Sequence, residues 1–266
     1  TLDTLVRDHG KMIVRHHPLD FGSTLGSAGI GPNDFWEGFQ YLYAGAPLLR
    51  KLPGLGFPVE PWRTIRYPAL RGVGRFEGER YDPEAWRSRV PNAAYIRADP
   101  FDKFWAARRV MAISDGMITA AVKSGKYSDP SAESYMIRTL ILRRNAIGRA
   151  YLAAVNPVVN PTLDAAGVLV FQNAVVDAGL VEAESVSYRT VWYTFDNSTG
   201  ESAPIGDPVP GGSPRIRAPG ALPSTAGFVR VDISAVSAGY PSWSTPVRAY
   251  FRRTAARWKL VGLERR

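Results

Sequence analysis

The apolar residues of this chain change their period once, near residues 156–166, and this change constrains the fold more than any other feature. Between residues 99 and 155, apolar side chains recur mostly at three- and four-residue steps, which is the period of one helix face. Beyond Pro161, apolar and polar residues alternate along short stretches, which is the period of a half-buried strand. The chain is therefore predicted to be α+β, with helices and strands in successive regions.

Two amphipathic helices are predicted before the change. The first begins at Asp99-Pro100, where Asp99 supplies an N-cap, and it ends at residues 124–125, Ser-Gly. The second begins at residues 129–130, Asp-Pro, and stops at residues 156–157, Asn-Pro. A short loop joins them, so a helical hairpin is expected. Their apolar stripes are Phe104, Ala107, Met111, Ile118 and Val122 in the first helix, and Met136, Leu140, Ile147 and Tyr151 in the second.

Strands are predicted after the change, at residues 167–171, 185–193, 228–233, 247–252 and 258–263. Residues 204–223 are rich in Pro, Gly and Ser and are predicted to be loop. The pattern predicts a small antiparallel β-sandwich-like domain at residues 165–266. Its expected core is Val168, Val170, Val191, Val231, Phe251 and Leu260. Two Asn-Pro steps within residues 156–161 are expected to form a stiff connector, so that the domain folds alone.

The N-terminal residues predict a β-hairpin followed by a short motif. Residues 2–6 and 12–14 are apolar runs, and residues 8–11 between them have hairpin-turn chemistry. Asp20-Phe21-Gly22 follows. This order is found just after the catalytic loop of protein-kinase-like enzymes, where the Asp holds the Mg²⁺ that bridges the nucleotide phosphates. Asp20 is therefore a candidate metal ligand; the alternative is that Asp20 caps a loop after a buried strand.

Small residues dominate the stretch from Gly22 to Asn33, which is predicted to be a flexible loop. The backbone amides of Gly22 and Ser23 would approach a phosphate closely, as glycine-rich nests do. The candidate nucleotide-binding residues are thus Asp20, Gly22 and Ser23, with ATP and Mg²⁺ as cofactors, while a plain linker is the alternative. Residues 53–100 are rich in Pro, Gly, Trp and Arg and are expected to wrap the next unit as an irregular segment.

Several phrases of the chain resemble one protein family. They are Leu19–Ser27, Phe104–Arg109, Tyr127–Pro130 and Trp258–Arg265. The family consists of large exported bacterial proteins without an assigned activity, and the chain is similar to its C-terminal half. The N-terminal part of that family looks like the nucleotide-binding lobe of an atypical kinase.

The resemblance implies that residues 1–160 form a kinase-C-lobe-like helical region with Asp20 as a metal ligand. It also implies that the phosphate-binding Lys and the catalytic-loop Asp and Asn belong to a segment of the same protein before Thr1. That N-terminal segment is the expected partner of this chain, and other proteins of an assembly are further possible partners. Because the chain starts at Thr1 with neither Met nor signal peptide, it is expected to be a processed or partial product. An exported, periplasmic or cell-surface location follows from the family.

Two functions are expected from these residues. In the first, the chain contributes a metal–nucleotide ligand to a longer phosphotransferase and is inactive alone, because phosphoryl transfer needs a nucleophile, a metal pair and a phosphate clamp together. In the second, the chain is a non-catalytic binding or assembly module of a larger exported complex, since aromatic anchors and sheet edges suit protein partners. For the first function, no catalytic side chain can be predicted from this sequence.

Composition removes several classes of site. The 33 Lys and Arg against 24 Asp and Glu give a net charge of +9, but the basic residues are spread along the chain, so no nucleic-acid partner is expected. Cysteine is absent, which excludes disulfides and thiolate metal sites. The sequence contains no run of about 18 apolar residues, so no transmembrane segment is predicted. Two further sets are expected to be structural: Trp62 and Trp86 as buried anchors, and Glu77, Glu79, Asp82 and Glu84 as ion-pair partners of Arg75, Arg80 and Arg87.

Overall fold

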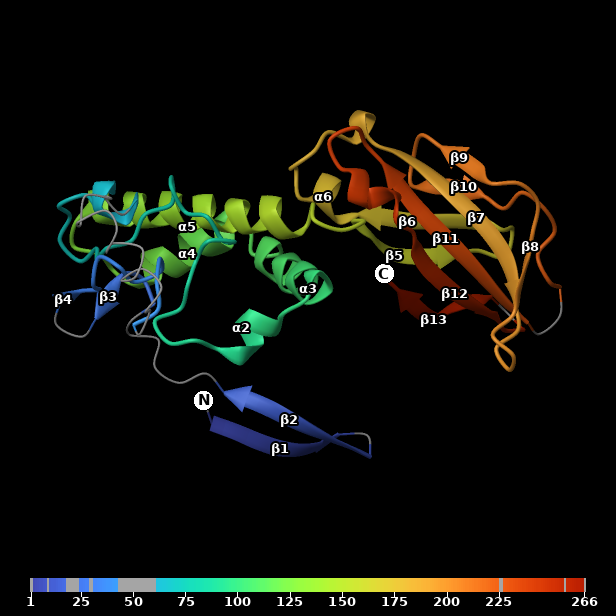
Figure 1. Cartoon of the computed structure of the whole chain (residues 1–266), viewed down its shortest axis with the longest axis horizontal. Coiled ribbons are helices and arrows are strands. Elements are labelled where there is room, and N and C mark those ends of the chain that lie inside the picture. The colour runs from blue at the N-terminus through green and yellow to red at the C-terminus, as the bar shows by residue number, and fades with distance from the viewer. Residues whose placement is uncertain are drawn as a thin grey trace, which may run out of the picture. The chain divides into compact units, whose positions relative to one another are not determined.

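The computed structural model of the chain describes residues 2–8, 10–17, 24–28, 31–42, 61–224, 227–255 and 257–265. The chain forms two compact units. The N-terminal unit comprises Thr1–Ala93 and Asp115–Arg143, and the C-terminal unit comprises Ala94–Ser114 and Arg144–Arg266. Helices and antiparallel sheets are both present, which confirms the mixed α and β character predicted from the two periods (Figure 1).

The N-terminal unit begins with the predicted hairpin. Strands β1 (Leu2–Asp8) and β2 (Lys11–His17) pair antiparallel, with Leu5 opposite Val14. Gly10 in the turn has φ +77°, a left-handed conformation that suits glycine. A second, very short pair follows, β3 (Ser27–Ala28) with β4 (Gly31–Pro32), and then the 3₁₀ turn η1 (Pro61–Thr64).

Helices α4 (Asp115–Ser124) and α5 (Pro130–Tyr151) supply the core of the N-terminal unit. Ile118 and Val122 of α4 pack with Met136 of α5 around Phe76, which comes from the irregular segment before α4. The Tyr135 hydroxyl donates a hydrogen bond of 2.8 Å to the Phe76 carbonyl. Phe76 of the predicted wrap therefore packs against the helices, whereas Trp86, which was expected to be a buried anchor, is 38% exposed.

The C-terminal unit is built from two antiparallel sheets. One has the strand order β10-β6-β5, and the other has the order β13-β12-β11-β7-β8, with β9 also paired to β7 (Figure 1). The strands are β5 (Val158–Leu163), β6 (Val168–Asn173), β7 (Ser187–Phe195), β8 (Ser202–Pro204), β9 (Val209–Gly211), β10 (Arg215–Arg217), β11 (Phe228–Val236), β12 (Val247–Arg253) and β13 (Trp258–Glu264).

Both sheets contribute to a single core, as in a sandwich. Leu169 and Phe171 of β6 share it with Val231 of β11 and Phe251 of β12. Helix α3 (Pro100–Met111) adds Phe104 to the same core and begins with a capping box, in which Asp99 and Asp102 satisfy each other's backbone amides. The remaining helical elements are α2 (Ala93–Arg97), α6 (Ala174–Asp177), η2 (Ala183–Ser185) and η3 (Pro241–Ser244).

The helix predicted from Pro100 to Ser124 is instead two helices, α3 and α4, separated at residues 112–114. Ser114-Asp115 has N-capping and first-turn chemistry, so a new helix starts there. The carbonyl of Ile113, which the break leaves without a helical partner, accepts a hydrogen bond of 2.8 Å from Nη1 of Arg144. The helical hairpin consists of α4 and α5 alone.

The predicted connector at Asn160-Pro161 is wrong, because it lies inside strand β5. Val158 and Val159 are buried, and β5 pairs with β6. The pairing register shifts between Val159 and Thr162, and Asn160 has φ +50°. Pro161 lies at this irregularity, where the hydrogen-bond ladder between β5 and β6 is interrupted and no backbone N–H is needed.

The predicted loop at residues 204–223 is also wrong in part, since β9 and β10 lie within it. These strands are three residues long and pair at sheet edges, where Pro210 is tolerated. In the predicted core, Val168, Val231 and Phe251 are buried, whereas Val170 and Leu260 are each 37% exposed. The observed units also differ from the predicted ranges 1–160 and 165–266, because the sandwich core reaches back to Phe104 and Val158.

Candidate functional site

The site residues predicted from the sequence, Asp20, Gly22 and Ser23, all lie outside the described residues. The structure therefore does not test the predicted nucleotide and Mg²⁺ site, which stays a prediction. Within the described part of the chain, no three His, Asp or Glu side chains come together as a metal site would require. No described helix has the length and apolar character needed to cross a membrane.

The predicted ion pairs of the acidic segment do not form among the described residues. Glu77 accepts a hydrogen bond of 2.8 Å from the backbone amide of Arg80, and Asp82 accepts one of 2.9 Å from the backbone amide of Glu84. Glu79 pairs instead with Arg138 of α5, and both side chains are exposed. Glu77 and Asp82 therefore cap turns, and Glu79 forms an exposed ion pair.

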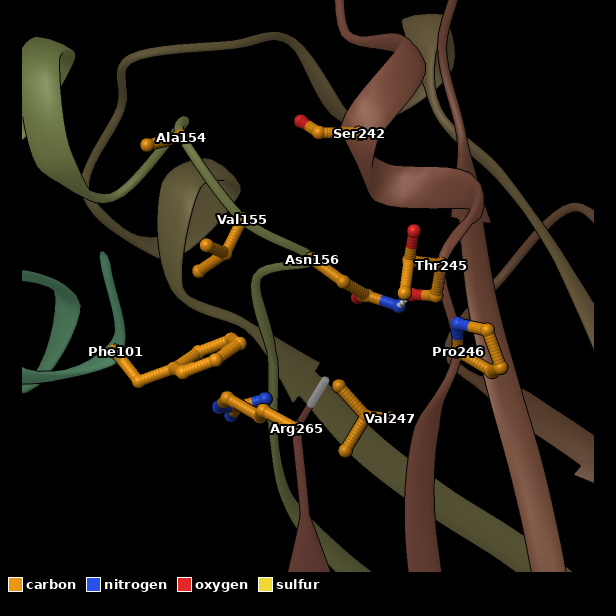
Figure 2. A pocket seen from close by; sticks show the side chains of 9 residues that line it. All are labelled: Phe101, Ala154, Val155, Asn156, Ser242, Thr245, Pro246, Val247 and Arg265. Atoms are coloured by element: carbon orange, nitrogen blue, oxygen red, sulfur yellow. Dashed lines mark hydrogen bonds between the residues drawn. The ribbon is translucent and has the colours of Figure 1, made fainter. Parts of the chain in front are cut away.

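A cavity of about 90 Å³ in the C-terminal unit is the strongest candidate site (Figure 2). Its lining comes from the first turn of α3, the segment after α5, the η3–β12 connection and the end of β13. The lining residues are Phe101, Ala154, Val155, Asn156, Ser242, Thr245, Pro246, Val247 and Arg265. We name it the Arg265 cavity.

Asn156 fixes one wall of the cavity. Its Nδ2 donates to the carbonyls of Ile233 at 2.8 Å and Thr245 at 2.9 Å, and its Oδ1 accepts from the amide of Val158 at 3.1 Å. These bonds tie the segment after α5 to β5, β11 and the start of β12. The buried indole of Trp243 donates to the Ala153 carbonyl at 2.8 Å, which holds η3 against the same segment. The cavity wall is therefore rigid.

Arg265 is the charged group of the cavity, and part of its guanidinium has no partner. Its Nη2 donates to the carbonyl of Val158, and its Cζ lies 4.7 Å from the centroid of the Phe104 ring. Its Nη1 is buried and has no hydrogen-bond partner among the described residues. Figure 2 shows the guanidinium of Arg265 next to Phe101, with Val247, Thr245 and Ser242 farther from it in the lining.

The charges near Arg265 are cationic. Burial, and then the positive charge of Arg108, lower the pKa of the Arg265 guanidinium to about 10. Burial, and then the charge of Arg109, lowers the pKa of Arg108 as well. Since burial and a neighbouring cation both disfavour the charged form, the protonated Arg265 would gain from an opposing charge.

The arrangement is suited to an oxyanion. A buried cation with an unsatisfied N–H is costly, and an incoming carboxylate or similar group would supply both the charge and the acceptor. Nη1 of Arg265 is the buried guanidinium nitrogen without an acceptor among the described residues, and apolar Phe101, Val155 and Val247 line the same cavity. The cavity therefore offers one charge-assisted hydrogen bond from Nη1 of Arg265 inside a small space.

Sequence reasoning did not identify this site. Arg265 directly follows a predicted strand, and nothing in the sequence around it distinguishes it from the other Lys and Arg residues among the 33 of the chain. Asn156 was interpreted as a helix stop, which it is, but its three hydrogen bonds depend on segments distant in the sequence. No local pattern indicates either role.

No protein-family model, curated protein or solved structure matches this chain. The family resemblance described above therefore stays a prediction, and the function is argued from the geometry of the site.

Proposed function

We propose that the C-terminal unit is a non-catalytic binding module that captures a carboxylate group of a protein partner in the Arg265 cavity. The observation that carries this proposal is the buried Nη1 of Arg265, which has no acceptor among the described residues. Among the described residues, the positive charge of Arg108 acts on Arg265, and no carboxylate pairs with it. A bound carboxylate would satisfy the nitrogen and compensate its charge.

The donor set favours a carboxylate over a phosphate. Nη2 of Arg265 is already committed to the Val158 carbonyl, so the guanidinium does not present its full fork. A phosphate carries more charge and more acceptor oxygens than one free nitrogen satisfies. The apolar side chains of Phe101, Val155 and Val247 suit the methylene carbons next to a carboxylate.

The size of the cavity favours a group that projects from a larger partner. Cavities that enclose whole small-molecule ligands measure about 300–1,000 Å³, whereas this one measures about 90 Å³. An acidic side chain of a peptide enters such a space while the rest of the peptide stays outside. This is the assembly function that the sequence left open.

The proposal is tested by NMR titration of the chain with Nα-acetyl-glutamate N-methylamide and with its glutamine counterpart. The glutamate probe is expected to shift the backbone amides of Asn156, Thr245 and Val247 in a saturable way, with a dissociation constant on the order of 1 mM. The glutamine probe is expected to leave them unchanged, because it lacks the charge.

Variants assign the effect to one residue. Arg265→Gln is expected to weaken binding at least about tenfold, since a hydrogen bond to a charged group contributes roughly 1.5–3 kcal/mol. Arg265→Lys keeps the charge and is expected to retain part of the binding. Arg252→Gln, an exposed cation of β12, is the matched control and should bind like the unmodified chain. Equal responses to both probes, or full binding by Arg265→Gln, would overturn the proposal.

A second proposal concerns the N-terminal unit, and the hairpin β1–β2 directly before Asp20 supports it. In the longer protein that the resemblance implies, Asp20 would bind the Mg²⁺ of Mg-ATP, with the backbone of Gly22 and Ser23 near the phosphates. This chain alone would then be inactive, as phosphoryl transfer needs the remaining parts.

Calorimetric titration of the longer protein with Mg-ATP tests this second proposal. Asp20→Ala is expected to weaken binding, and Asp34→Ala, an exposed acid in the same region, is the control. Unchanged affinity in Asp20→Ala would remove Asp20 from the site.

A further inference from the structure

A second cavity in the C-terminal unit, of about 330 Å³, shares no lining residue with the Arg265 cavity. It is lined by the end of β6, helix α6, the η2 segment, the start of β7 and the connection from β9 to β10. Its polar lining includes Asn173, Asp177, Glu184 and Tyr188, and its apolar lining includes Phe171 and Pro214. We name it the Tyr188 cavity.

The Tyr188 hydroxyl is a buried donor whose hydrogen is uncommitted. Tyr188 is 5% exposed, and its hydroxyl oxygen accepts a hydrogen bond of 3.2 Å from Nδ2 of Asn173. Asn173 is itself 3% exposed and held in place, since its Oδ1 caps α6 by accepting from the amides of Val175 and Val176. Among the described residues, no acceptor receives the hydroxyl hydrogen of Tyr188.

Asp177 supplies an uncommitted acceptor in the same cavity. Asp177 lines the cavity and is exposed, and no described residue donates a hydrogen bond to it or pairs with it. Partial burial raises the pKa of its carboxyl. Asp177 and Tyr188 line the same cavity, and burial, together with the charge of Asp177, raises the pKa of the Tyr188 phenol. Glu184, which is also exposed, adds a second carboxylate to the lining.

A hydroxyl group fits this pair better than a charged group does. A hydroxyl accepts a hydrogen bond from Tyr188 and donates one to Asp177 through the same oxygen. An anion would be repelled by the two carboxylates, and an ammonium only donates, which leaves the Tyr188 hydrogen without an acceptor. Apolar Phe171, Val176 and Pro214 offer surface for the C–H face of a ring.

We infer that the Tyr188 cavity binds a neutral polyhydroxylated ligand, namely a sugar ring. The inference is independent of the proposed capture of a carboxylate by Arg265. The volume lies at the lower end of the range for small-molecule sites, about 300–1,000 Å³, which suits a single ring rather than a long oligosaccharide.

The inference is tested by titrating the chain with methyl glucoside, methyl galactoside and methyl mannoside, while the backbone amides are followed by NMR. At least one glycoside is expected to shift the amides of residues 172–177 and 184–188 in a saturable way. Butylammonium and acetate, as the cationic and anionic probes, are expected to leave these amides unchanged. If no glycoside shifts them, or if butylammonium does so instead, the inference is overturned.

Variants separate the hydroxyl from the packing of the ring. Tyr188→Phe keeps the edge-to-face contact with Phe171, whose ring centroid lies 5.0 Å away, and removes only the hydroxyl. It is expected to weaken glycoside binding about five- to tenfold, the effect of one hydrogen bond. Glu182→Gln, an exposed acid of the same segment that does not line the cavity, is the control. Equal binding by Tyr188→Phe and the unmodified chain would contradict the inference.

Discussion

At the scale of single residues, the surroundings of two buried arginines, Arg143 and Arg265, indicate different roles. Arg143 of α5 has a buried Nε without a partner, but its guanidinium lies 4.3 Å from the Phe76 ring and 4.0 Å from the Tyr81 ring. Negative charge on Glu77 also acts on it. Arg265 has one ring contact, a cavity beside it and another cation nearby. Arg143 is therefore assigned to packing and Arg265 to binding.

The packing role of Arg143 predicts a loss of stability on substitution. Arg143→Gln is expected to lower the free energy of unfolding of the N-terminal unit by about 1–3 kcal/mol, because two cation–π contacts are lost at a largely desolvated position. Urea denaturation measures the change. Arg138→Gln, on the same helix, should cost at most about 0.5 kcal/mol, since its pair with Glu79 is exposed. Similar losses for both variants would contradict the assignment.

The Asp177 carboxyl predicts a dependence of stability on pH. Burial raises its pKa above the ordinary 3.8, so the protonated form favours the folded state. That stabilisation is complete below pH 3.8 and is lost as the pH rises through the raised pKa. Asp177→Asn is therefore expected to raise Tm at pH 7 and to give no gain below about pH 4.

Asp196 provides the opposite sign for comparison in the same experiment. Hydrogen bonds from Ser198 and Thr199 lower the pKa of its carboxyl, so Asp196→Asn should lower Tm at pH 7 and have no effect at low pH. Thermal denaturation between pH 3 and pH 7 measures both variants. A loss of Tm at pH 7 for Asp177→Asn would show that its carboxylate is compensated.

Among the elements, periodicity located those with a continuous pattern and missed those shaped by distant contacts. The alternation at residues 228–233 and the helical stripe from Met136 are both found in the structure. Strand β5 was missed because Asn160-Pro161 interrupts its pattern, and β10 because it is three residues long. The Arg265 cavity was missed for a related reason, since its walls come from four segments that only the tertiary fold brings together.

The side chain of Asn156 connects β5, β11 and the segment before β12 through hydrogen bonds. Substitution of Asn156 measures how much these bonds contribute to stability. Asn156→Ala is expected to lower the free energy of unfolding of the C-terminal unit by about 2–4 kcal/mol, because it leaves the Ile233 and Thr245 carbonyls and the Val158 amide without this partner. Urea denaturation followed by tryptophan fluorescence measures the loss. Asn197→Ala, at an exposed turn, is the control. A loss below about 1 kcal/mol, the value of a single hydrogen bond, would contradict the account.

At the scale of the whole molecule, the chain forms two units, and each unit is made of two separate stretches of the sequence. Residues 94–114 belong with residues 144–266, because Phe104 and Ala107 of α3 pack in the sandwich core. Strand β5 and the Ala153 carbonyl, which accepts from Trp243, also precede residue 165. A fragment that starts at residue 165 lacks all of these contacts.

This organisation predicts the behaviour of two fragments. Residues 94–266 are expected to unfold in one cooperative thermal transition, whereas residues 165–266 are expected to unfold at a clearly lower temperature or without a cooperative transition. Circular dichroism of both fragments measures the difference. Equal Tm values would place the boundary at residue 165, as the sequence alone predicts.

The central claim is that the C-terminal unit holds a carboxylate at Arg265. The most direct measurement follows the side-chain guanidinium resonances of Arg265 by NMR while the glutamate probe is added to the intact chain. A hydrogen-bonded carboxylate is expected to shift the Nη1–H resonances of Arg265 downfield and slow their exchange with water, with no change at Arg252. Resonances of Arg265 that stay unchanged at saturating probe, or that change equally with the glutamine probe, would contradict the claim.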